Sequence, residues 1–147
     1  MKFKKNYYVG WELKFFDSSN QFREYQFDLI KDEINGYLAE TGPGNGKNIS
    51  LYLNKCFKID LFEPSYNLFT VLKKKFSKNK KINIKNKEFS GKNNLYDCIL
   101  YMDVIEHIKN DKREIEKAYK SLKKGGRLII NVPAFNHLYS KFDKDVG

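Results

Sequence analysis

Two carboxylates and the glycine-rich segment that follows the first of them are the residues of this sequence best suited to holding a ligand. Residues 40–46 read ETGPGNG, and Glu63 follows Glu40 by 23 positions. Glycines let a backbone turn tightly and approach a ligand closely, and one carboxylate can accept hydrogen bonds from both hydroxyls of a ribose. The alternatives are a turn with a structural role only, and a Glu63 that only favours the N-terminus of the next helix.

The spacing of the glycines separates two classes of nucleotide ligand. A dinucleotide fingerprint requires G-x-G-x-x-G, with a pyrophosphate at the helix N-terminus. Counted from Gly42 and Gly44, the third glycine position is occupied by Lys47, and the third glycine is Gly46 instead. The carboxylate of Glu40 would also repel a pyrophosphate. S-adenosylmethionine (SAM) fits better, because it carries an ammonium group and a sulfonium but no phosphate.

Hydrophobic periodicity indicates the elements that must position these residues. Strands are predicted at residues 37–41, 57–62, 82–84, 98–102 and 128–132. Helices are predicted from about Asn20 to Ile34 with Phe22, Tyr25, Leu29 and Ile30 facing inward, from about residue 49, from Pro64, and from an N-cap at Asp111 to the pair Gly125–Gly126. This alternation predicts an α/β protein with a mostly parallel sheet and helices on both faces. Ligands of such sheets bind at the carboxyl ends of the strands, where both carboxylates fall.

Four segments resemble motifs of a known family. They are residues 40–46, residues 62–64 (FEP), residues 101–108 (YMDVIEHI) and residues 122–128 (LKKGGRL), with Lys124 where the family usually has proline. Their order and content resemble the class I SAM-dependent methyltransferases, and in particular the broad type 11 and type 12 groups. The resemblance runs from about Trp11 to the end of the sequence. It implies a Rossmann-like SAM-methyltransferase fold.

The resemblance also implies roles for individual residues. Contacts with SAM are implied for Glu40, Gly42, Gly44, Gly46, Glu63, Glu88, Met102 and Asp103. The first four would surround the methionine part, Glu63 would hold the ribose, and Glu88 would lie near the adenine amine, with an exposed loop acid as the alternative. No catalytic residue is identified. His107 and His137 are candidates for a general base, because histidine titrates near neutral pH, although a structural His107 and a solvated His137 are the simpler interpretations.

The domain boundaries follow from the same resemblance. Residues 1–147 are expected to form a single SAM-binding domain, with an aromatic N-terminal segment and a helix in residues 1–35. Full-length members of the family have two further strands beside the fifth, so we expect a C-terminally incomplete sheet that lacks them. The predicted function is SAM-dependent methyl transfer to an acceptor that the sequence does not identify. The alternative is a non-catalytic SAM-binding remnant.

Charge leaves a third hypothesis open. The formal net charge is +10, from 28 basic and 18 acidic residues, and such an excess can mark a nucleic-acid or anionic-membrane partner. Only three of the basic residues are arginine, the residue that most often reads phosphates and bases. A solvated surface is therefore favoured over a nucleic-acid-binding module.

The remaining composition indicates a cytoplasmic protein without a metal site. No apolar run reaches the roughly 20 residues of a membrane-spanning helix, and no secretory signal precedes the first predicted helix. Cys56 and Cys98 lie far apart in apolar stretches, which is typical of buried thiols in a reducing compartment. Neither residue belongs to a CxxC or Cys/His cluster.

Overall fold

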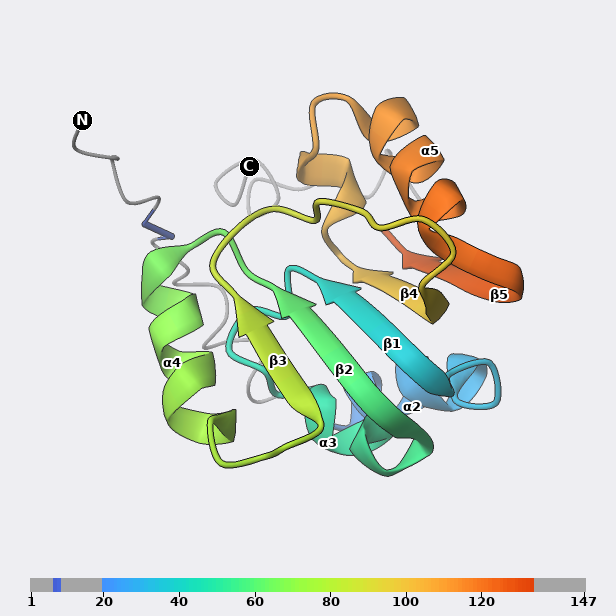
Figure 1. The fold of residues 1–147 in the computed structure, drawn as a ribbon. Helices are drawn as coiled ribbons and strands as arrows, with labels where there is room; N and C mark the ends of the chain where they lie inside the picture. Colours follow the sequence, from blue (N-terminus) through green and yellow to red (C-terminus); the bar gives the residue numbers. More distant parts are fainter. Residues whose placement is uncertain (1–6, 9–19, 134–147) are drawn as a thin grey trace, which may run out of the picture.

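The computed structural model describes residues 7–8 and 20–133, which form one parallel sheet with helices packed on it (Figure 1). The strands are β1 (Gly36–Thr41), β2 (Cys56–Phe62), β3 (Ile82–Lys85), β4 (Tyr96–Met102) and β5 (Leu122–Asn131), in the spatial order β3-β2-β1-β4-β5. The chain runs outward from β1 through β2 to β3 and then returns to place β4 on the other side of β1. The order of strands therefore reverses at β1 and β4, as in doubly wound folds.

Helices cover both faces of this sheet, as the sequence predicted. They are α2 (Asn20–Ile30), α3 (Ile49–Tyr52), α4 (Tyr66–Phe76) and α5 (Asp111–Ser121), with short 3-10 turns η1 (Leu53–Lys55) and η2 (Ile105–His107). One core contains Leu38 and Leu100 of the sheet with residues of α2, α3 and α4 packed against them. The second core lies on the other face, where Ala118 of α5 packs with Ile99. None of the helices in the described part of the chain is long and apolar enough to cross a bilayer.

The first described helix differs from its prediction in length and orientation. α2 ends at Ile30 rather than Ile34, and Glu33 closes the turn after it by donating its backbone N–H to the Ile30 carbonyl over 3.0 Å. Ile30 packs against the core as predicted, and so does Phe27. Tyr25 and Leu29 are exposed instead. The prediction was wrong for Tyr25 and Leu29 because several apolar residues are distributed around the helix, and sequence spacing alone did not identify every residue that meets the sheet.

The last helix also begins and ends differently. Its N-cap is Asn110, whose side chain accepts a hydrogen bond from the backbone N–H of Arg113, and not Asp111. α5 ends at Ser121, and the next strand begins at once with Leu122. The glycine pair lies within β5, where the pairing with β4 shifts register between Tyr96 and Cys98. The two glycines therefore lie at an irregularity in the pairing of β5 with β4, and they do not end a helix.

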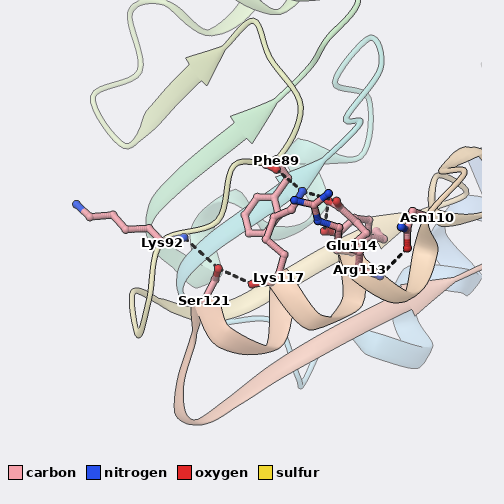
Figure 2. A network of polar contacts seen from close by, with 8 residues as sticks. Phe89, Lys92, Asn110, Arg113, Glu114, Lys117 and Ser121 are labelled. Atoms are coloured by element: carbon pink, nitrogen blue, oxygen red, sulfur yellow. Dashed lines mark hydrogen bonds and ion pairs between the residues drawn. The ribbon is translucent and has the colours of Figure 1, made fainter.

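A network of polar contacts ties α5 to the connection between β3 and β4 (Figure 2). The ammonium of Lys117 donates to the Phe89 carbonyl over 2.8 Å and pairs with the carboxylate of Glu114. The hydroxyl of Ser121 accepts from the backbone N–H of Lys92 over 3.0 Å. Glu114 in turn accepts from the hydroxyl of Tyr101 in β4, over 2.9 Å. These bonds fix the β3–β4 connection beside the sheet.

Asp60 is the most heavily bonded buried carboxylate of the described residues. It accepts hydrogen bonds from the hydroxyls of Tyr37 and Tyr96, the ammonium of Lys85 and the side-chain amide of Asn83, over 2.6–3.0 Å. Burial alone would raise the pKa of Asp60, but the bonds from Lys85, Tyr96 and Asn83 outweigh it and lower the pKa. This cluster joins β1, β2, β3 and β4, so it cross-links the sheet through side chains.

Asp60→Asn should destabilise the protein by about 3 kcal/mol, because it leaves the ammonium of Lys85 without its counter-charge. Urea unfolding followed by circular dichroism measures the loss. The lowered pKa of Asp60 means that its stabilisation is present above about pH 4 and is lost as the pH falls through the folded-state pKa, so the difference between wild type and variant should shrink in acid. The control is Asp28→Asn, which breaks an exposed pair with Lys31 and should cost about 1 kcal/mol or less. Equal losses in the two variants would contradict the cross-linking role.

Candidate functional site

The candidate residues meet at the carboxyl end of the sheet, at the point where the strand order reverses. Thr41, the last residue of β1, pairs with Phe62 of β2 and with Tyr101 of β4. The glycine turn, Glu63 and Asp103 follow these strand ends directly. Parallel pairing therefore brings together three segments that are far apart in the sequence. This is the position at which open α/β sheets bind their ligands.

The glycine turn adopts a backbone that other residues rarely accept. Gly42, Gly44 and Gly46 have φ angles of +64°, +58° and +77°. The turn is anchored by the backbone N–H of Gly42, which donates to the Phe62 carbonyl over 2.9 Å. An added Cβ at Gly42 would lie 2.7 Å from a methyl of Val104, and one at Gly46 would lie 2.6 Å from a methyl of Leu72. Packing alone therefore requires glycine at these two positions, in addition to any role in binding.

Glu63 connects this turn to the start of α4. Its side chain is 3% exposed, and one carboxylate oxygen accepts from the backbone N–H of Gly44 over 3.1 Å while the other accepts from that of Ser65 over 2.9 Å. Ser65 is the N-cap of α4, so the helix begins at Tyr66 rather than at Pro64 as the sequence predicted. Burial raises the pKa of Glu63, and the two amide bonds partly offset that effect. Each oxygen keeps a further lone pair for another donor.

Glu40 is buried in a different environment. It belongs to β1 itself, is 2% exposed, and accepts a hydrogen bond from the hydroxyl of Tyr52 at the end of α3. Burial raises the pKa of Glu40 to about 7, the hydrogen bond from Tyr52 opposes this, and the nearby charge of Glu63 adds to it. The sequence did not indicate this partnership between Tyr52 and Glu40. It depends on the fold of the segment between them.

At the end of β4, Asp103 is held by two hydrogen bonds to Asn131, a residue that the sequence analysis did not single out. Asp103 has a φ angle of +54°, which is unusual outside glycine. Its backbone N–H donates to the Asn131 carbonyl over 2.9 Å, and its carboxylate accepts from the side-chain amide of Asn131 over 2.7 Å. Met102, just before it, packs against the core. A polar residue within the predicted apolar strand of residues 128–132 was the available signal for Asn131.

The other candidates lie at varying distances from this centre. Glu88 is exposed in the β3–β4 connection. Asn86, which the sequence did not single out, donates its side-chain amide to the carbonyls of Glu63 and Pro64 over 2.9 and 3.0 Å. His107 is exposed in η2, with its ring 4.0 Å from the carboxylate of Glu106. His137 lies outside the described residues.

A short part of the aromatic N-terminal segment lies beside the same edge. The backbone N–H of Tyr8 donates to the side chain of Asn67 over 3.1 Å, and the Asn67 amide donates back to the Tyr8 carbonyl over 2.8 Å. Asn67 belongs to the first turn of α4, four residues after Glu63. Tyr8 therefore lies close to the start of α4. Trp11, Phe15 and Phe16 lie outside the described residues.

Comparison with known proteins agrees with this geometry. The sequence matches the methyltransferase domain family over residues 15–144. No curated protein sequence gives a significant match. Solved structures share the fold: a SAM-dependent methyltransferase from Leishmania major is 15% identical with a TM-score of 0.64, and the match covers 73% of this chain and 47% of the other. The YcgJ protein from Bacillus subtilis is 12% identical with a TM-score of 0.66, covering 74% and 50%.

A third structure, DhpI in its complex with SAH, is 12% identical with a TM-score of 0.65, and the match covers 84% of this chain and 65% of DhpI. At such identities the likeness shows the fold. The chain spans about half the length of the Leishmania and Bacillus proteins. Because the family match covers most of the sequence and solved structures share the fold, the chain belongs to the methyltransferase domain family.

Proposed function

We propose that this chain binds SAM at the carboxyl ends of β1, β2 and β4 and takes part in methyl transfer to an acceptor of a class not yet known. The observation that carries the proposal is the buried carboxylate of Glu63, held between the glycine turn and the N-cap of α4. A carboxylate in that position is fixed at the point where the strand order reverses, and it keeps acceptor capacity for two hydroxyls.

The residues present fit the cofactor. The glycine turn contributes close backbone approach, and the three acidic side chains Glu40, Glu63 and Asp103 give this edge a negative character that suits a cationic ligand. We propose that Glu63 holds the ribose. Glu40 and Asp103 favour the ammonium end of the methionine part, together with Gly42, Gly44, Gly46 and the backbone at Met102. A dinucleotide would meet the same carboxylates with its phosphates and be repelled.

Two residues of the β3–β4 connection are candidates for contact with the adenine. Glu88 is exposed in the β3–β4 connection, whereas Asn86 contacts the segment that contains Glu63. Comparison of the Glu88→Ala and Asn86→Ala variants decides between them. The residue that contacts adenine is the one whose removal weakens SAM binding. The tether between Tyr8 and Asn67 supports a position for the N-terminal segment beside the bound nucleoside.

The chemistry of transfer requires little from the protein beyond positioning. SAM supplies a methyl group on a sulfonium, which is already a good leaving group. The chain's own residues would fix the orientation of this donor, and proximity alone can contribute roughly 7–11 kcal/mol to a reaction between two bound partners. A base is needed only if the acceptor must lose a proton. His107 lies near Asp103 in the segment after β4, and it is our candidate, with His137 as the second.

Glu63→Ala should weaken SAM binding by about 1.5–3 kcal/mol, the range for hydrogen bonds to a charged group. Calorimetric titration of the purified chain with SAM measures the change. The matched control is Glu116→Ala, which removes an exposed carboxylate on α5 and should leave the affinity unaltered. If wild type and Glu63→Ala bind SAM equally, the ribose role is wrong. Transfer of labelled methyl from SAM to fractions of a cell extract then tests activity, and binding without transfer would favour the non-catalytic alternative.

The pKa of Glu40, near 7, gives a second prediction. Below this pH the carboxyl group is mostly neutral, so the affinity for SAM should rise about tenfold between pH 6 and pH 8 as the side chain ionises. Glu40→Gln keeps the size of the side chain and cannot ionise, so its affinity should follow only the titration of SAM itself. Parallel pH profiles for wild type and variant would exclude Glu40 as a charge partner.

The stability of the ligand-free protein should change in the opposite direction. Because the folded-state pKa of Glu40 is raised above its unfolded value, its contribution is complete below about pH 4.5 and is lost as the pH rises through 7. Wild type should therefore lose stability relative to Glu40→Gln over this window, by about 1.4 kcal/mol for each pH unit. Denaturant unfolding at fixed pH values measures the trend.

A further inference from the structure

The positive charge of this protein is segregated along the sequence. Residues 64–87 contain eight lysines and not one aspartate or glutamate. In α5, by contrast, the eleven residues of DKREIEKAYKS alternate three acids with four basic residues. A general bias toward lysine codons would enrich both segments in lysine without removing the acids from one of them. The acid-free segment is therefore a local property of α4, β3 and the turn between them.

Seven of the eight lysines of this segment are exposed and have no carboxylate partner among the described residues. Lys78, Lys80 and Lys81 are exposed in the turn that leads into β3. Among the described residues of the segment, only Lys85 forms an ion pair, with Asp60. Lys73, Lys74 and Lys75 occupy the last turn of α4, where they also suit the helix dipole. The helix dipole does not explain Lys78, Lys80 and Lys81, which lie after the end of α4.

An exposed aromatic ring lies beside these lysines because of a β-bulge. Gly36 of β1 pairs with Cys56 and Tyr37 pairs with Lys58, so Phe57 is an additional residue in β2. Bulges redirect side chains, and the Phe57 side chain is 63% exposed. The neighbouring ammonium of Lys58 lies 4.6 Å from the centroid of the Tyr37 ring.

Lys81 connects the turn before β3 to the bulge in β2. The ammonium of Lys81 donates to the Cys56 carbonyl over 3.1 Å, directly beside Phe57. The backbone carbonyl of Lys81 accepts from Ile59, next to Lys58. We call Phe57, Lys58 and the turn lysines Lys78, Lys80 and Lys81 the basic edge. It lies at the amino ends of β2 and β3, opposite the strand tips in Figure 1 that carry the candidate cofactor site.

We propose that the basic edge binds a single-stranded nucleic acid, with phosphates at the lysines and a base stacked on Phe57. Lysine ammoniums neutralise phosphates without reading sequence, and an exposed aromatic ring accepts any base on its face. An anionic membrane would call for a wider apolar surface around the lysines, whereas Phe57 is a single exposed ring. A duplex keeps its bases stacked internally and would leave this ring without a partner.

Fluorescence anisotropy with a labelled single-stranded oligonucleotide, titrated at several salt concentrations, tests the proposal. The triple variant Lys58→Gln, Lys78→Gln and Lys80→Gln should reduce the slope of log affinity against log salt by about 2, at roughly 0.7 for each phosphate contact in a single strand. The matched control is Lys109→Gln, Lys112→Gln and Lys120→Gln, which removes the same charge from exposed positions on and just before α5. This control should change the slope little.

The variant Phe57→Ala removes the aromatic ring and leaves every lysine in place, so it measures the contribution of base stacking to the affinity for the oligonucleotide. It should weaken binding about fivefold or more, since stacking of one base contributes roughly 1–3 kcal/mol, and it should leave the salt slope unaltered. All of these variants should bind SAM like wild type, because the basic edge lies at the other end of the strands. Failure of the nucleic-acid proposal is thus distinguishable from failure of the proposed cofactor site.

Three results would overturn the proposal. Equal losses in the two triple variants would mean that net charge acts without a defined site. An unaltered affinity of Phe57→Ala would exclude the stacked base. Binding to vesicles that contain an anionic phospholipid, with no binding of the oligonucleotide, would assign the surface to a membrane instead.

Discussion

The central position of β1 is the constraint on which the rest of the structure depends. β1 pairs in parallel with β2 on one side and β4 on the other, and both of its faces are covered. A strand buried in this way cannot continue into solvent without a sharp turn, and the glycines that follow it supply that turn. The reversal of strand order at β1 then brings the segments after β2 and β4 to the same edge. The site is a consequence of this topology.

The buried carboxyl groups of Glu40, Asp60 and Glu63 receive hydrogen bonds from three different sets of donors. Asp60 receives donors from four side chains, and its pKa is lowered. Glu63 receives two backbone amides, and its pKa stays raised. Glu40 receives a single tyrosine hydroxyl in a fully enclosed place, and its pKa is raised furthest, to about 7. Glu40, which precedes the glycine turn, thus has the fewest hydrogen-bond donors of the three. A cationic group of a ligand would therefore stabilise its ionised form more than that of the other two carboxylates.

Charge of opposite sign gathers at two separate places of the sheet. Acidic side chains lie at the carboxyl ends of β1, β2 and β4, while exposed lysines lie at the amino ends of β2 and β3. Because exposed charges are screened beyond about 8–10 Å at physiological ionic strength, the two regions act on their surroundings separately. A protein with a large overall positive charge can therefore still present a locally negative site to a cationic nucleoside.

The sequence by itself determined the parallel α/β class and the placement of Glu40, the glycine turn and Glu63 at strand ends. These features depend on hydrophobic periodicity and on the order of motifs, which are local properties. It also predicted the strands of the sheet, although the fifth begins earlier, at Leu122 rather than 128. Helix ends were less predictable. The limits of α2 and α5 depend on which of several apolar or capping residues meets the sheet, as at Ile30 and Asn110.

Only the tertiary structure decided which side chains share a site. Tyr52 bonds to Glu40 across a turn, Asn131 holds Asp103 from another strand, and Asn86 contacts the segment of Glu63 where Glu88 had been expected to matter. The bulge at Phe57 is likewise invisible in the sequence, because it arises from the register of β1 against β2. Each of these contacts joins two residues whose proximity cannot be read from the hydrophobic periodicity of either segment. Their geometry is set by strand pairing and packing, which a single sequence does not encode locally.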